Sequence, residues 1–96
     1  MTQQNITILG STGSIGQSTI DVVMRHPGRF RVHALSGNLR MAKLAEQAHY
    51  TQADCVIVPT DDAAKAFRDA FGLQGKIPEI RVGQDALVQT AADRET

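Results

Sequence analysis

Ile6-Thr7-Ile8-Leu9-Gly10-Ser11-Thr12-Gly13-Ser14-Ile15-Gly16 is the stretch that decides the fold of this 96-residue chain. Its first four residues form an apolar, β-branched run of the kind that predicts a short buried strand. Three glycines spaced three residues apart follow, and a helical pattern comes next. A strand, a glycine-rich turn and a helix in direct succession indicate a loop that binds the diphosphate of a dinucleotide.

The chemistry of a diphosphate explains the residue types in this loop. Glycine is needed where the backbone bends sharply, where it approaches the anion, and where the helix lies close to the strand. The helix that starts after Gly13 points its free N–H groups and the positive end of its dipole at the loop. A bound diphosphate is therefore stabilised without a cationic side chain. Hydroxyl groups add further donors at Ser11, Thr12 and Ser14.

Two other interpretations of the loop need weighing. The spacing is G-x-x-G-x-x-G rather than the common G-x-G-x-x-G, so an ordinary glycine- and serine-rich turn is the structural alternative. Three glycines at fixed spacing between a strand and a helix favour nucleotide binding over that alternative. A Walker-type phosphate loop is excluded, because Gly-Lys-Ser or Gly-Lys-Thr does not occur in the chain.

The rest of the chain alternates short apolar runs with segments of helical period. This order predicts an α/β fold, a Rossmann-like parallel sheet with helices on both faces, formed by residues 1–96 as one domain. Strands are expected at 6–9, 30–36, 55–58 and 80–82, and helices at 14–25, 40–50, 61–71 and 84–92. Gly72 is expected to end the third helix in the left-handed conformation.

Periodicity also predicts which side chains are buried. In the second strand, Phe30, Val32 and Ala34 are expected to alternate with Arg31, His33 and Leu35. The helical faces expected to be buried consist of Ile20, Val23 and Met24, then Met41, Leu44, Ala45 and Ala48, then Ala63, Ala66, Phe67, Ala70 and Phe71.

Composition limits the possible partners and the compartment. Ten acidic and ten basic side chains balance, so nothing indicates nucleic acid or an acidic membrane surface as a partner. Cys55 is the single cysteine and lies in an apolar run, which predicts core packing rather than a disulfide. The first residues carry no basic group and no long apolar segment, so the expected location is the cytoplasm.

The corner after the second strand bears on the choice of nucleotide. NAD-binding units usually end this strand in Asp or Glu, which accepts hydrogen bonds from the adenosine ribose. Here the corner reads Ser36-Gly37-Asn38-Leu39-Arg40. A neutral loop with a nearby guanidinium accepts a 2′-phosphate, so NADP is preferred over NAD. The alternative for Arg40 is a solvated residue in the first turn of the second helix.

Catalytic groups are not evident in this sequence. Tyr50 is not followed by the x-x-x-Lys of short-chain dehydrogenases. His26, His33 and His49 are scattered and lack the clustered carboxylates or cysteines of a metal site. Asp61-Asp62 is better explained as a helix start than as an acid–base pair. We therefore expect no catalytic residue and no metal ligand in these 96 residues.

The chain resembles the N-terminus of the 1-deoxy-D-xylulose 5-phosphate reductoisomerase family. The likeness runs through Ile6 to Gly16, Ser18-Thr19-Ile20-Asp21-Val22-Val23, Phe30-Arg31-Val32-His33-Ala34-Leu35 and Leu44-Ala45-Glu46-Gln47. Continuous agreement over strand, loop, helix and second strand is far more specific than glycine spacing alone.

This resemblance implies an oxidoreductase of isoprenoid precursor synthesis. Members convert 1-deoxy-D-xylulose 5-phosphate to 2-C-methyl-D-erythritol 4-phosphate with NADPH and Mg²⁺ or Mn²⁺, usually as cytoplasmic homodimers. The chain would be the incomplete N-terminal, NADPH-binding portion, without the catalytic and C-terminal domains, and inactive alone. The diphosphate and ribose would lie against Thr12, Gly13, Ser14 and Ile15, and the 2′-phosphate against Gly37, Asn38 and Arg40. Many relatives place a basic residue next to an Asn in this corner, and Leu39 and Arg40 depart from that pattern in this chain.

Two alternatives remain open. One is another NADP-dependent reductase with a similar loop, in which Cys55 would be a candidate nucleophile, although its apolar setting argues against a reactive thiolate. The other is a non-catalytic module that senses NADP, which would account for a chain without catalytic residues.

Overall fold

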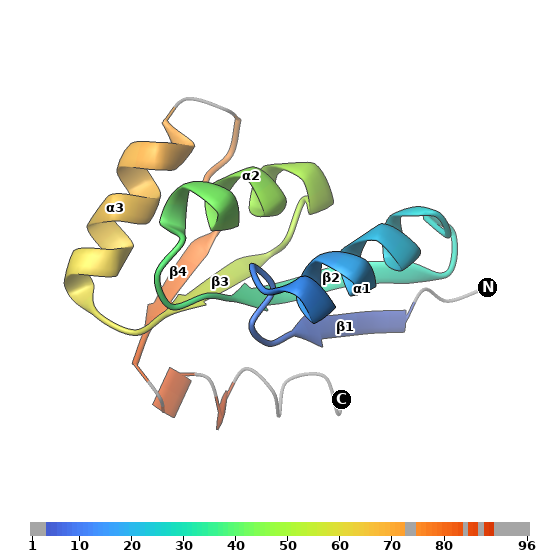
Figure 1. The fold of residues 1–96 in the computed structure, drawn as a ribbon, viewed down its shortest axis with the longest axis horizontal. Coiled ribbons are helices and arrows are strands. Elements are labelled where there is room, and N and C mark those ends of the chain that lie inside the picture. Colours follow the sequence, from blue (N-terminus) through green and yellow to red (C-terminus); the bar gives the residue numbers. More distant parts are fainter. Residues whose placement is uncertain (1–3, 73–74, 84, 87, 90–96) are drawn as a thin grey trace.

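A four-stranded parallel sheet, in the order β1-β2-β3-β4, forms the centre of the computed structural model (Figure 1). The structure describes residues 4–72, 75–83, 85–86 and 88–89. Its strands are β1 (Gln4–Ile8), β2 (Phe30–Ser36), β3 (Cys55–Val58) and β4 (Glu79–Val82), and its helices are α1 (Ser14–Met24), α2 (Met41–Thr51) and α3 (Asp61–Phe71). The predicted α/β fold with a parallel sheet is confirmed.

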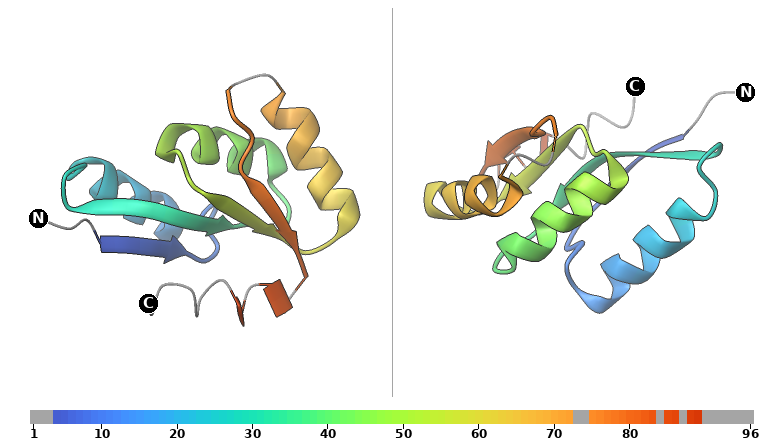
Figure 2. Two further views of the ribbon diagram at one scale, coloured as in Figure 1. Left: turned by 180° about the vertical axis from the view of Figure 1, so that it is seen from behind. Right: turned by 90° about the horizontal axis from the view of Figure 1, so that it is seen from above.

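The three helices lie on one face of the sheet (Figure 2). Each crossover adds the next strand on the same side of the previous one, and parallel crossovers are almost always right-handed, so every helix falls on the same face. The opposite face buries Ala34, Cys55 and Ile57, and Ala86 packs against them. Residues 85–86 and 88–89 of the expected last helix are helical, whereas 84, 87 and 90–92 lie outside the described residues.

A bulge in β2 changes which of its side chains reach the main core. Ile6 pairs with Val32 and Thr7 pairs with Ala34, so His33 is an extra residue with no partner position on β1. Val32 and Leu35 therefore both face the helices, and Ala34 faces the opposite side. The expectation that Val32 and Ala34 share a face was wrong, because strict alternation cannot anticipate an inserted residue.

The helices bury most of the residues that their period predicts. Met41, Leu44, Ala45 and Ala48 of α2 are all buried, as expected. On α3 the buried residues are Ala64, Phe67 and Phe71, whereas Ala66 is exposed and Ala63 and Ala70 are partly buried. The prediction for α3 was therefore rotated toward the wrong alanines, because six alanines and phenylalanines in nine residues leave the centre of the apolar face poorly defined.

Gly72 ends α3 with φ +59° and ψ −127°. The positive φ agrees with the expected use of glycine, but this ψ lies outside the left-handed helical region. The residue in the left-handed helical region is Gln52, which ends α2 with φ +56° and ψ +40°.

Among the described residues, no helix is long and apolar enough to cross a membrane. Cys55 is 1% exposed in the sheet, as expected of a core residue.

An ion pair links β2 to the start of β3 at the amino edge of the sheet. Arg31 makes a two-pronged contact with the carboxylate of Asp54, and Nδ1 of His33 lies 3.0 Å from Asp54 Oδ2. The hydrogen bonds from Arg31 hold the pKa of the Asp54 carboxyl below its usual range, against a smaller opposing effect of burial.

We expect Asp54→Asn to remove an acid-dependent part of the stability. A carboxyl with a lowered pKa stabilises the fold above its unfolded pKa of about 4, and that contribution disappears as the pH falls toward the folded pKa. Both partners are more than a third exposed, so the effect is at most about 1 kcal/mol. Urea unfolding between pH 3 and 7 measures how the free energy of unfolding changes with pH, with Asp69→Asn as control. If that free energy changes equally with pH in the wild type and in Asp54→Asn, the prediction is contradicted.

Candidate nucleotide-binding site

The carboxyl ends of the four parallel strands meet at one edge of the sheet, to which the arrowheads in Figure 1 point. Ligands of open α/β sheets bind at this edge. The glycine loop, residues 9–13, follows β1 there, and Gly37-Asn38-Leu39-Arg40 follows β2. A hollow of about 360 Å³ lies beside them, lined by Ser36, Gly37, Asn38, Ile57, Val58, Pro59 and Gly83.

Gly10 and Gly13 of the loop and Gly16 of α1 serve three different needs. Gly10 has φ +65°, a conformation that glycine adopts more readily than residues with a Cβ. A Cβ on Gly16 would lie 2.5 Å from Gly10 O and from Ser11 Cα, so α1 packs directly on the loop's own backbone. A Cβ on Gly13 would meet only Gly10 O, at an ordinary 3.5 Å. Neither strain nor packing thus requires glycine at position 13, whereas a ligand approaching the exposed backbone there would.

The N-termini of the helices at this edge differ in what satisfies their N–H groups. The first N–H groups of a helix have no partner within it. In α3, Thr60 Oγ1 accepts from Ala63 N at 3.1 Å, and Asp61 and Asp62 supply negative charge. In α1, Gly13 has no side chain with which to cap, and no acidic residue lies in the first turn. The start of α1 can therefore accept an anion, whereas the start of α3 already carries two carboxylates of its own. Asp61-Asp62 is a helix start, as predicted.

The predicted diphosphate residues divide into an exposed and a buried group. Gly13, Ser14 and Ile15 are exposed at the start of α1, and Ile15 is 85% exposed. Thr12 is buried within the loop. Ser11 is fully buried, and its hydroxyl donates to Gln47 Oε1 at 2.8 Å. The expectation that the Ser11 hydroxyl would be a donor to a ligand was wrong.

Ser36 at the end of β2 joins the glycine loop to the second predicted group. Gly10 N donates to Ser36 Oγ at 2.8 Å, and Ser11 N donates to Ser36 O at 2.8 Å. Gly37 is buried, and a Cβ there would lie 3.5 Å from Thr12 Cγ2. The structure therefore brings the two groups predicted from separate stretches of sequence together at one edge.

Arg40 and its neighbours form the outer part of this edge. Asn38, Leu39 and Arg40 are exposed, and Arg40 is the N-cap residue of α2. That helix also begins with no side-chain cap and no acidic residue in its first turn. Within the described part of the chain, no carboxylate forms an ion pair with Arg40. A guanidinium and an uncapped helix start at one corner make it positive.

Gln47 is a residue of the site that the sequence analysis did not single out. It is 6% exposed on α2, and its amide contacts Ser11 at both ends. Its position three residues after Leu44 places it on the buried face, and that spacing was the available signal. A polar residue at a buried helical position needs a buried partner, which only the folded loop reveals.

The histidines and acidic residues of the described ranges do not form a cluster. No group of three or more His, Cys, Asp or Glu side chains gathers there. Of the three histidines, His26 packs against Phe30, His33 contacts Asp54, and His49 packs against Phe71.

A strand, a tight glycine loop and an uncapped helix start at the carboxyl edge of a parallel sheet define a Rossmann-like, dinucleotide-binding class of domain. Residues 6–96 match the sequence profile of 1-deoxy-D-xylulose 5-phosphate reductoisomerase. The chain belongs to this family.

Individual relatives agree with the family profile. The chain is 57% identical over 90 residues to the 1-deoxy-D-xylulose 5-phosphate reductoisomerase of Bordetella avium, and 47% identical over 94 residues to that of Streptomyces coelicolor. These alignments cover 94% and 93% of the chain, but 23% and 22% of the relatives. The chain thus spans about a quarter of the length of the curated relatives that it matches.

Solved structures of 1-deoxy-D-xylulose 5-phosphate reductoisomerases are similar in fold to this chain. The reductoisomerase of Zymomonas mobilis in complex with NADPH superimposes with a TM-score of 0.82 at 34% identity, covering 93% of this chain and 23% of that one. A reductoisomerase in complex with NADPH, fosmidomycin and magnesium gives 0.77 at 35% identity, covering 94% of this chain and 22% of that one.

Proposed function

We propose that this chain is the NADPH-binding portion of a 1-deoxy-D-xylulose 5-phosphate reductoisomerase. The whole enzyme would convert 1-deoxy-D-xylulose 5-phosphate to 2-C-methyl-D-erythritol 4-phosphate in isoprenoid precursor synthesis. Family membership and the NADPH bound by the Zymomonas mobilis relative support this proposal. The observation that carries it is the start of α1, where an exposed glycine N-cap leaves the first N–H groups without a cap or a nearby carboxylate.

The diphosphate would lie against Thr12, Gly13, Ser14 and Ile15. Backbone N–H groups at the start of α1 would donate to its oxygens, and the helix dipole would favour its charge. The absence of a side chain at Gly13 would let the anion approach closely. Ile15, which is largely exposed in this chain, would offer apolar contact to the neighbouring ribose.

The 2′-phosphate would lie against Gly37, Asn38 and Arg40. The corner holds no carboxylate that would repel it, and Arg40 offers charge-assisted hydrogen bonds. The uncapped start of α2 adds backbone N–H groups, which also attract an anion. The chain would therefore select NADPH over NADH.

Arg40→Glu tests the choice of nucleotide. The substitution places a carboxylate where the 2′-phosphate is proposed to lie, so we expect the affinity for NADPH to fall at least about tenfold, which is 1.4 kcal/mol. The affinity for NADH should stay within about twofold of that of the wild type. Fluorescence titration of both nucleotides measures this, with Lys65→Glu on exposed α3 as a control for charge. Equal affinity of the wild type for NADPH and NADH would contradict the proposed 2′-phosphate site.

Catalysis would require parts of the enzyme beyond these residues. The nicotinamide supplies a hydride, and a bound substrate must be oriented against it. Mg²⁺ or Mn²⁺ and the sugar phosphate would be held by later domains, so this chain alone would turn over no substrate. We further propose that the complete enzyme is a cytoplasmic homodimer.

Among the described residues, no strand pairs with the outer edge of β1, which supports the proposal that the domain continues. An apolar groove of about 570 Å³ runs along α1 at that side, lined in part by Ile6, Val22 and Phe30. Val22 of α1 is 53% exposed beside this groove. A later segment of the reductoisomerase chain would cover this groove and extend the sheet, since open strand edges in native domains are normally covered.

The buried position of Cys55 disfavours the other NADP-dependent reductases. A nucleophilic thiolate needs an accessible, electropositive site. Cys55 is instead 1% exposed, and its Sγ lies 3.8 Å from His33 O at the middle of the sheet.

A further inference from the structure

The glycine loop is held with its carbonyl oxygens turned into the protein. Gly10 O accepts from Gly13 N at 3.1 Å, and Gly13 O accepts from Gln17 N at 2.9 Å. Thr12 O accepts from Gln17 Nε2 at 3.1 Å, and Ser11 O accepts from Gln47 Nε2 at 2.8 Å. Four consecutive carbonyl groups are thus satisfied internally. Each of these oxygens is thus occupied by an internal donor.

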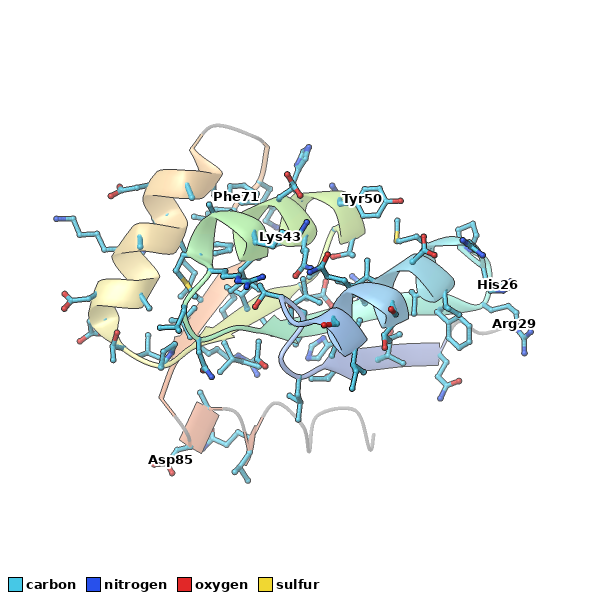
Figure 3. All side chains as sticks on the ribbon, viewed as in Figure 1. His26, Arg29, Lys43, Tyr50, Phe71 and Asp85 are labelled. Carbon is cyan, nitrogen blue, oxygen red and sulfur yellow. The ribbon has the colours of Figure 1, made fainter. Side chains whose placement is uncertain are left out.

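Gln47 is the only one of these donors that comes from outside the loop and its helix. Gln47 also lines a hollow of about 350 Å³ between α1 and α2, together with Lys43 and Tyr50. Figure 3 labels Lys43 and Tyr50 on α2. Its Nε2 donates to Ser11 O while its Oε1 accepts from Ser11 Oγ, both at 2.8 Å. Both ends of one buried amide are therefore used on one residue of the loop.

We infer that Gln47 is a positioning residue for nucleotide binding: it fixes the Ser11 peptide so that the N–H groups beyond it face the diphosphate. This inference rests on the proposed function. Ser11 N is fixed on the other side by Ser36 O at 2.8 Å, so the residue is held from both β2 and α2. Releasing the α2 side allows the Ser11 carbonyl to turn toward solvent, where it would repel an anion.

An amide is required for this role. A glutamate at position 47 has the same shape and can still accept from the Ser11 hydroxyl, but it has no hydrogen to donate to Ser11 O. It would also place a negative charge behind the loop. A methionine fills a similar volume and contacts neither Ser11 atom by hydrogen bonding. The two substitutions therefore remove the same donor with and without added charge.

The test uses Gln47→Met and Gln47→Glu in the 96-residue chain, with Gln4→Glu as the matched charge control at the amino edge of the sheet. Nuclear magnetic resonance of the free chain should show shifted amide signals at residues 11–14 in both Gln47 variants, with α3 unchanged. At a temperature where each variant is fully folded by circular dichroism, the Kd for NADPH should rise about tenfold or more in Gln47→Glu and about fivefold in Gln47→Met. Gln4→Glu should bind like the wild type.

The possible outcomes separate this inference from the proposed function. If the folded Gln47 variants keep wild-type amide signals at residues 11–14, or bind NADPH as tightly as a wild type that binds it, Gln47 does not position the loop. If the wild type binds no NADPH, the proposed function fails, while the amide signals still decide whether Gln47 fixes the loop. Should Gln47→Glu unfold, Gln47→Met decides on both readouts.

Discussion

Gly16→Ala is expected to destabilise the fold by about 2 kcal/mol and to lower Tm by roughly 10 °C. The added Cβ would lie 2.5 Å from Gly10 O and Ser11 Cα, which are backbone atoms that cannot rotate aside. Alanine gains about 1 kcal/mol of helix propensity over glycine, but the clash outweighs it because α1 and the loop must separate. Binding of NADPH should weaken as well, since the displaced loop forms the diphosphate site.

Gly28→Ala is the control for this experiment. A Cβ at Gly28 meets nothing within 4 Å, so the same chemical change there should leave Tm within about 3 °C of the wild type. Thermal unfolding followed by circular dichroism measures both variants. A Gly16→Ala variant as stable as Gly28→Ala would show that α1 does not pack on the loop as the structure has it.

Gly13→Ala is expected to leave the stability of the fold nearly unchanged, in contrast to Gly16→Ala. Its affinity for NADPH should fall about tenfold or more. The new methyl group would meet only Gly10 O at 3.5 Å, and alanine at an N-cap costs less than about 1 kcal/mol relative to glycine. The methyl group would nevertheless stand on the exposed backbone against which the diphosphate is proposed to lie.

The contrast between the two glycines can be measured on one pair of proteins. Thermal unfolding should rank Gly16→Ala far below Gly13→Ala, whereas titration of the folded proteins with NADPH should show weakened binding in Gly13→Ala. If Gly13→Ala binds NADPH as tightly as the wild type, the diphosphate does not contact the start of α1.

Local sequence predicted most of this fold because its signals are strong and short in range. The run Cys55 to Val58 is continuously apolar and became β3 without a change of boundary. The Thr60-Asp61-Asp62 cap and the apolar period placed α3 within its observed bounds. Gly10, Gly13 and Gly16 were assigned to one loop, and its position at the carboxyl edge next to Gly37 followed from the parallel order of the strands.

The features that sequence could not predict depend on contacts between distant residues. The bulge at His33 is visible only in the register of β2 against β1, and it decides whether Ala34 or Leu35 enters the main core. The buried Ser11 hydroxyl and Gln47 amide form a hydrogen bond although 36 positions separate them in the sequence. The local sequence around either residue therefore does not predict this pair. The common face of the three helices depends on the strand order β1-β2-β3-β4, which no local pattern encodes.

Titration of the ¹⁵N-labelled chain with NADPH tests the central claim most directly. If the start of α1 binds the diphosphate and the corner after β2 binds the 2′-phosphate, the amide signals of residues 12–16 and 37–40 shift together and saturate, while those of α3 and of Asp54 stay in place. NADH should shift residues 12–16 at higher concentration and leave 37–40 nearly unmoved. Amides of residues 12–16 that do not respond at about 1 mM NADPH, or a response centred elsewhere, would contradict the proposed binding site.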